Sequence, residues 1–90
     1  METLVSLNQK NLKRKWDKKY RVVIFDIPEK KSGDRIWLRE ELYLLKYKQL
    51  QKSVYFSKFP LSTDIIKEIR QRKIGNYVNY LLVNKIYSTF

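Results

Sequence analysis

A single carboxylate at the end of an apolar run is the feature of this sequence with the clearest chemical potential. Residues Val22 to Phe25 are apolar, Asp26 follows them directly, and Pro28 prevents the strand from continuing. Such a run predicts a β-strand over 20–27 that is buried on both faces. A carboxylate there is costly to bury unless it is paired, hydrogen-bonded or bound to a metal. Asp26 is therefore the candidate catalytic and metal-binding residue.

Two interpretations of Asp26 stay open. The first is structural: the carboxylate caps local backbone N–H groups or pairs with Arg35. In the second, Asp26 from each of two subunits holds one Mg²⁺ with several waters, because this cation prefers oxygen ligands. An ion bound in that way could activate water against a phosphodiester. Glu29 is close in sequence but is expected in the loop that follows the strand.

The composition excludes several kinds of catalysis and of membrane attachment. The 90 residues include no Cys and no His, which removes thiol chemistry, disulfides, imidazole bases and ordinary zinc sites. No segment approaches the roughly 18 apolar residues of a spanning helix, and the N-terminus lacks the apolar core of a signal peptide. The missing Cys fits a cytoplasmic protein. Hydrophobic and aromatic contents of 43% and 14% favour a packed domain.

The charge balance points to a polyanionic partner. There are 20 Lys and Arg against 9 Asp and Glu, a net charge of +11, and such an excess makes nucleic acid the leading candidate. Residues 1–19 show little apolar periodicity and are read as a basic arm, either a solvated tail or a segment that contacts phosphates. The candidate phosphate-binding residues of the arm and its junction with the strand are Lys10, Lys13, Arg14, Lys15, Lys18, Lys19 and Arg21.

A helix is predicted over about 34–46, after a loop from Glu29 to Gly33. Its buried stripe is Leu38, Leu42 and Leu45, at helical spacing, and Trp37 and Leu44 could widen that face. Arg35 should point back towards the end of the first strand. Arg35 and Arg39 on this helix are further candidates for phosphate contacts.

The segment from Tyr47 to Pro60 is rich in β-forming residues. It is either one long bent strand or a hairpin that turns near Lys52, and no Asn-Gly or Gly-X signal decides between them. Val54 and Phe56 are expected in the core and Lys52 in solvent, where it is a candidate nucleic-acid contact. The roles of Gln51 and Tyr55 stay open, because basic and aromatic strand faces can also stack bases.

The C-terminal half predicts one more helix and one more strand. Ser62 or Thr63 can cap a helix of about 63–73 that buries Ile65, Ile66 and Ile69. Gly75-Asn76 is expected to form the turn out of that helix, before a strand over 77–83. The order predicts an α+β, ferredoxin-like βαββαβ sandwich over 20–90, with one antiparallel sheet and two helices on one face. Because its other face would be bare, we expect a homodimer through the sheet.

Two pieces of sequence resemble a known family. Val22 to Pro28, followed by Glu29, and Gln51-Lys-Ser-Val-Tyr55 are similar to the small CRISPR-associated adaptation protein, the second core Cas protein and partner of the Cas integrase. The similarity covers about residues 20–83. The same pair occurs in the related central domain of PaaX-type repressors, which usually follows a winged helix. Only about 19 residues precede the first strand here, which favours the stand-alone Cas protein.

The resemblance implies roles for individual residues. Asp26 matches the metal-binding Asp, Phe25 the residue before it, Arg35 a helix-entry Arg and Tyr55 the aromatic after Ser-Val. The family has been described as Mg²⁺-dependent endonucleases acting on RNA or DNA. Two positions depart from the pattern, since Gly33 lies where a second Arg can stand and Gln49 where a basic residue can stand. These departures weaken the case for nuclease activity and leave the scaffold role untouched.

The expected function is therefore a dimeric scaffold of CRISPR spacer acquisition in antiviral defence. Its expected partners are a second copy, the Cas integrase subunit and double-stranded protospacer DNA, which it would hold without reading sequence. The alternatives are a Mg²⁺-dependent endonuclease that uses Asp26 from both subunits, and a PaaX-type regulator module.

Overall fold

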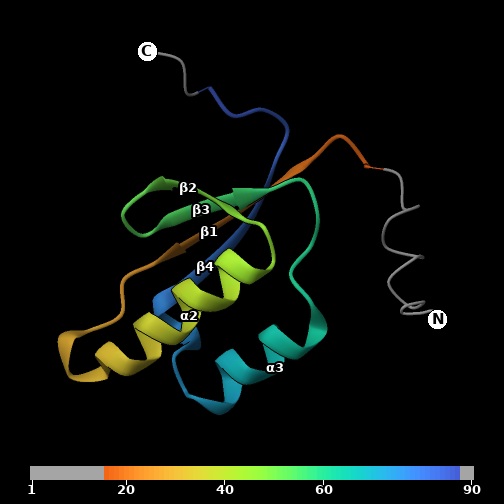
Figure 1. The fold of residues 1–90 in the computed structure, drawn as a ribbon. Helices are drawn as coiled ribbons and strands as arrows, with labels where there is room; N and C mark the ends of the chain where they lie inside the picture. Colours follow the sequence, from red (N-terminus) through yellow and green to blue (C-terminus); the bar gives the residue numbers. More distant parts are fainter. Residues whose placement is uncertain (1–15, 88–90) are drawn as a thin grey trace.

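Residues 16–87 are described by the computed structural model, and they form one four-stranded antiparallel sheet with two helices on one of its faces (Figure 1). The sheet order is β2-β3-β1-β4. The elements are β1 (Tyr20–Phe25), α2 (Ser32–Leu44), β2 (Lys48–Gln51), β3 (Val54–Ser57), α3 (Thr63–Gln71) and β4 (Val78–Val83), with 3₁₀ turns at Glu29–Lys31 and Gly75–Tyr77. The predicted α+β, ferredoxin-like arrangement is confirmed.

The central strand β1 is covered by helices on one side only. Val23 and Phe25 point into the core beneath α2 and α3, where they are 0% and 3% exposed. On the opposite face, Val22 is also buried (8% exposed), whereas Tyr20 and Ile24 are partly exposed. In a single chain, the prediction of a strand buried on both faces is therefore confirmed at Val22 and wrong at Tyr20 and Ile24, because both crossover helices lie on the same side of the sheet.

Helix α2 begins at Ser32 and ends at Leu44, two residues earlier at each end than predicted. Leu38 and Leu42 are fully buried, and Leu45 and Trp37 pack against the core. Leu44 is 67% exposed, so the buried face does not extend to it. Helical geometry explains the difference, because position 44 lies about 130° from the centre of the buried stripe at 100° per residue.

The segment after α2 forms a hairpin rather than one bent strand. Strands β2 and β3 pair antiparallel with an irregularity between Gln49 and Gln51. Tyr55 is the core residue of β3, whereas Val54 and Phe56 lie on the helix-free face and are partly exposed, which reverses the expectation. Side chains alternate between the two faces along a strand. The register of β3 against β1 places Tyr55 beside the buried Val23, so Val54 and Phe56 must lie on the other face.

Both helices end in Schellman motifs with a lysine at the left-handed position. Lys46 after α2 has φ 68° and Lys73 after α3 has φ 60°. The 6→1 hydrogen bonds join Tyr47 N to Leu42 O (2.9 Å) and Ile74 N to Ile69 O (3.2 Å). Gly75 has no positive φ, so the prediction that Gly75-Asn76 forms the turn out of α3 is wrong. The chain has already turned at Lys73, in a conformation that usually favours Gly.

Ser62 is the N-cap of α3, as predicted, since its Oγ accepts a hydrogen bond from Ile65 N (3.3 Å). The helix then buries Ile65 and Ile69 and packs Ile66 against the core. Over residues 16–87, neither helix has the length and apolarity needed to cross a bilayer.

Candidate nucleic-acid interface

Asp26 ends the central strand with its carboxylate in solvent. Its backbone N–H donates to Tyr77 O (2.8 Å), which extends the ladder between β1 and β4 by one bond. Within residues 16–87 the carboxylate has no hydrogen bond and no ion pair. Arg35 pairs with Glu29 instead (3.1 Å). The structural interpretation of Asp26, with Arg35 as its partner, is therefore wrong.

The residues of one chain do not fit a complete Mg²⁺ site. No group of three or more potential metal ligands comes together in the part of the chain that the structure describes. The nearest carboxylate in sequence, Glu29, is engaged with Arg35. A single exposed carboxylate leaves most of the coordination to water or to a second subunit, so Mg²⁺ binding stays a prediction that depends on dimerisation.

The candidate phosphate-binding residues are not equally available. Lys10, Lys13, Arg14 and Lys15 lie outside the described residues. Lys18, Lys19 and Lys52 are exposed. Arg39 is partly buried, and its Nε has no acceptor among residues 16–87. It lines a shallow hollow with Tyr43 and Leu44, both exposed, and Tyr55.

Arg21 has a structural role that the sequence did not indicate. Its guanidinium pairs with both oxygens of Asp17 at 2.8 Å and donates to Lys19 O and Lys58 O at 3.1 Å. It thus ties the entry of β1 to the end of β3. The hydrogen bond from Arg21 holds the pKa of Asp17 below its usual value, and the same bond raises the pKa of Arg21. These contacts reduce the availability of Arg21 for phosphate.

A second paired arginine joins the two helices. Arg72 donates to Asp34 (2.8 Å) and to Glu68 (3.0 Å), and its guanidinium lies 4.2 Å from the centre of the Trp37 ring. The bond from Arg72 to Asp34 is the main cause that raises the pKa of Arg72. Arg72 therefore fixes α3 against α2.

The two aromatic residues among the four that match family positions, Phe25 and Tyr55, pack against each other. The rings of Phe25 and Tyr55 are stacked with centroids 5.9 Å apart and an interplanar angle of 18°. They are 3% and 8% exposed. In a single chain both therefore serve the core between β1, β3 and α2, and neither ring is open for stacking on a base.

The helix-free face of the sheet is apolar. Residues directly opposite each other in a ladder share a face, so the register places Val22, Phe56 and Leu81 in one row. The next row holds Ile24 and Val54, and β4 adds the polar, exposed Asn79 to it. Tyr20 and Val83 extend the surface at one end, and Leu81 is 43% exposed. We call the seven apolar residues of this surface the open sheet face.

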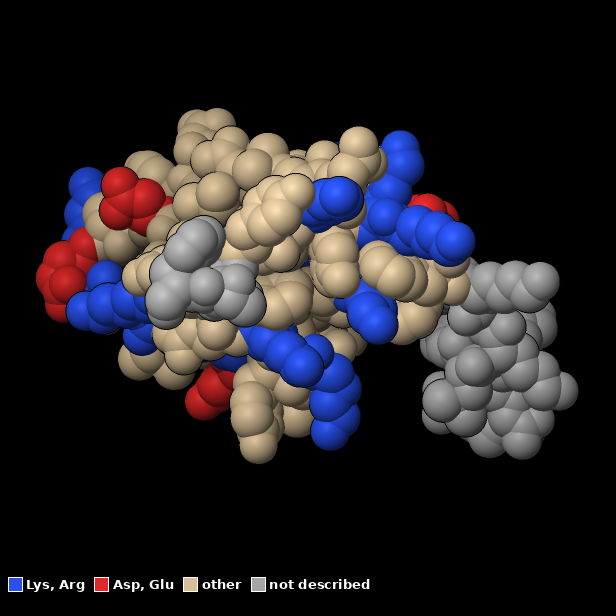
Figure 2. Space-filling model, turned by 90° about the horizontal axis from the view of Figure 1, so that it is seen from above, with Lys and Arg blue, Asp and Glu red and all other residues tan. Residues whose placement is uncertain are grey.

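Cations surround this face more than acids do. Figure 2 views the molecule from above the sheet and shows uncharged surface interleaved with Lys and Arg, while most Asp and Glu lie towards the edge of the view. Lys48 lies opposite Phe56 in the ladder and so borders the open sheet face. The sequence predicted a bare sheet face that a second copy would cover, but it placed Val54 and Phe56 in the core and not on that face. The alternation of Val54, Tyr55 and Phe56 was the available signal.

Comparison with known proteins identifies the family. The family model described as the PaaX protein central Cas2-like domain matches residues 13–89. A search of curated proteins finds no match. The matched span includes every strand and helix described above and the pair of sequence pieces that suggested a Cas relationship. On this evidence, the chain belongs to the PaaX central Cas2-like domain family.

Proposed function

We propose that this chain is a non-catalytic dimeric scaffold that holds duplex DNA through non-sequence-specific phosphate contacts. The open sheet face is the observation that carries the proposal. A contiguous apolar surface on a small, highly charged monomer is typical of an interface. Two copies joined through this face by a two-fold axis would combine their cations on one particle.

The charge of the chain supports duplex binding. Each chain has a net charge of +11, so the two copies of a dimer would repel each other and attract a polyanion. The exposed lysines, among them Lys18, Lys19 and Lys52, can contact phosphates without any base readout. The Cas2-like family relationship supports the same role, in which the dimer would join an integrase in spacer acquisition.

Two measurements on the purified full chain test the proposal. Sedimentation velocity should give a dimer, and fluorescence anisotropy should show that a labelled duplex of about 30 base pairs binds with equal affinity whatever its sequence. The logarithm of the affinity should fall linearly with the logarithm of salt, by about 0.9 for each phosphate contact. A monomer that binds no duplex at low salt would refute the scaffold.

The family match itself favours a second candidate, a regulator module of the PaaX type. This candidate predicts that affinity depends on sequence, because a regulator must distinguish its operator from other DNA. A footprinting experiment on the DNA around its own gene separates the two. One protected site with a large excess of affinity would favour the regulator, and uniform protection would favour the scaffold.

The exposed Asp26 carboxylate favours a third candidate, a metal-dependent endonuclease. Asp26→Asn preserves size and removes the charge that would bind Mg²⁺. Cleavage of single-stranded RNA and duplex DNA should then be lost while the dimer persists. Cleavage at an unchanged rate in the Asp26→Asn protein would exclude Asp26 as the catalytic residue. A complete absence of cleavage in the unaltered protein would favour the non-catalytic scaffold.

A further inference from the structure

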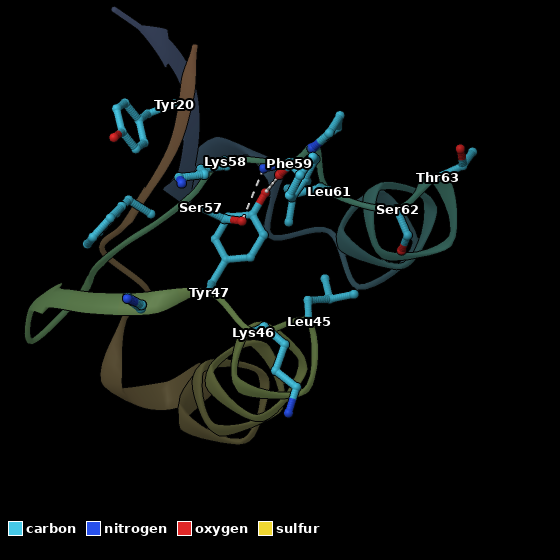
Figure 3. A pocket seen from close by; sticks show the side chains of 13 residues that line it. Tyr20, Leu45, Lys46, Tyr47, Ser57, Lys58, Phe59, Leu61, Ser62 and Thr63 are labelled. Carbon is cyan, nitrogen blue, oxygen red and sulfur yellow. Dashed lines mark hydrogen bonds between the residues drawn. The ribbon is translucent and has the colours of Figure 1, made fainter. Parts of the chain in front are cut away.

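A hollow of about 1070 Å³ opens at the end of the molecule where α2 leads into β2 and β3 leads into α3 (Figure 3). Tyr47 and Phe59 line it, and Tyr20 and Phe56 of the open sheet face form its border on the side of the sheet. Tyr47 is 6% exposed and forms part of the floor, whereas Phe59 is 40% exposed. The volume is at the upper end of what small-molecule sites usually enclose.

The chain segment that borders the hollow is held in place by its neighbours. Tyr47 Oη donates to Phe59 O (2.8 Å), as Figure 3 shows, and Leu61 N donates to Tyr80 Oη (2.9 Å). The Arg21 guanidinium donates to Lys58 O (3.1 Å) at the start of the same segment. Three side chains from β1, β4 and the end of α2 thus fix residues 58–61, so little ordering cost remains for a ligand.

Every charged residue that lines the hollow is a lysine: Lys46, Lys48 and Lys58. None of them forms an ion pair within residues 16–87. Lys58 lies over the Trp16 ring at 4.8 Å, on the side of Tyr20, while Lys46 lies on the side of Leu45 (Figure 3). Cations therefore stand on different sides of an aromatic hollow.

Lys46 also occupies a position that disfavours lysine. Its φ of 68° is left-handed, a conformation that is unfavourable for L-residues, and glycine usually stands there. Lys73 has the same conformation but does not line the hollow, so it provides a matched control.

We propose that the hollow takes one unstacked nucleotide of a single-stranded nucleic acid, with the base against Phe59 and Tyr47 and the phosphate near the lysines. Paired bases are stacked inside a duplex and cannot enter a concave site, whereas single strands offer free bases and phosphates. An acidic peptide would satisfy the lysines but not the aromatic lining. The inference deepens the proposed function, since it adds a single-strand site to a duplex-binding scaffold.

The test uses fluorescence anisotropy with a labelled oligo(dT) of 12 nucleotides and, separately, a labelled duplex. Phe59→Ala should weaken oligo(dT) binding about 5- to 100-fold, from the usual contribution of one stacked base. Lys48→Ala should lower the salt slope for oligo(dT) by about 0.7, the loss of one phosphate contact. Duplex affinity should be little changed by Phe59→Ala, because the duplex does not reach the hollow.

The two lysines in left-handed helix C-caps give the sharpest control. Lys46→Gly and Lys73→Gly remove the same charge from the same conformation, and both should raise stability, so a misfolded variant is easily recognised. Only Lys46→Gly should weaken oligo(dT) binding. Equal weakening by both, or no effect of Phe59→Ala, would overturn the hollow site and leave the duplex scaffold standing.

Two competitors identify the ligand. Unlabelled oligo(dT) should displace the probe at far lower concentration than free thymidine monophosphate if the site takes a nucleotide within a strand. Equal displacement by the mononucleotide would assign the hollow to free nucleotides instead. Displacement by a poly-glutamate peptide at the same charge concentration as oligo(dT) would contradict a nucleotide site altogether.

Discussion

Leu81→Ala should weaken the proposed dimer by an amount that the structure allows us to calculate. Leu81 lies on the edge strand β4, opposite Val22 in the open sheet face, and is 43% exposed in one chain. Full burial of a leucine side chain contributes about 1.5–3 kcal/mol, so burial of the remaining 43% contributes about 1 kcal/mol per copy. A two-fold interface contains the residue twice, and the loss of about 2 kcal/mol raises the dissociation constant about 30-fold.

The assay is sedimentation velocity on the full chain over a concentration series at fixed salt. Leu82→Ala is the matched control, because Leu82 is the next residue of β4, points to the opposite side of the sheet and is more exposed, at 57%. It should change the dissociation constant little. Added salt should strengthen the unaltered dimer, since it screens the repulsion between two cationic subunits. If Leu82→Ala weakened association as much as Leu81→Ala, or if the protein stayed monomeric, the assignment of the interface would be wrong.

Three further predictions concern the fold. Lys73→Gly should raise the free energy of unfolding by about 0.5–1 kcal/mol by relieving the left-handed strain; urea unfolding measures it, and a lower midpoint would contradict the C-cap assignment. Tyr47→Phe should lower stability by about 1–2 kcal/mol, because the Phe59 carbonyl loses the donor that the buried hydroxyl supplies; an unchanged midpoint would mean that water replaces it. The third follows from the depressed pKa of Asp17. Its folded pKa lies below the unfolded one, so its contribution is present above about pH 4 and is lost as the pH falls through the folded pKa. Asp17→Asn should remove part of the decline in thermal midpoint between about pH 4 and pH 2, and an unchanged decline would rule out this pair as its source.

Periodicity was sufficient to predict the element order and most of the core. The stripe of Leu38 and Leu42, the Ser62 cap and the Ile65–Ile69 pair follow from local spacing, and the structure confirms each of them. The ends of the elements were less predictable. A lysine in a left-handed cap has no sequence signal, because that conformation is imposed by the buried contacts of Ile74 and Tyr47 that follow each helix.

Long-range choices explain the remaining differences. The turn near Lys52 lacks turn-forming residues, and the hairpin is instead supported by the pairing of β3 with β1 and by the Phe25 N to Ser53 O bond (3.1 Å). Likewise, the sequence placed Asp26 at the end of a strand, but it did not indicate whether Arg35 forms its ion pair with Asp26 or with Glu29. The partner of Arg35 depends on the position of the first turn of α2 relative to the sheet, and no local sequence pattern encodes that position.

The apolar face and the cationic charge of this molecule act against each other in the absence of a polyanion. Burial of the open sheet face favours association, while two chains with a net charge of +11 each repel on approach. A duplex that contacts both subunits removes that repulsion, so DNA binding and dimerisation must strengthen each other by the same free energy. The scaffold would then assemble most strongly where nucleic acid is present. In this view the excess of lysine has two consequences: it holds the phosphates and it makes the dimer conditional on them.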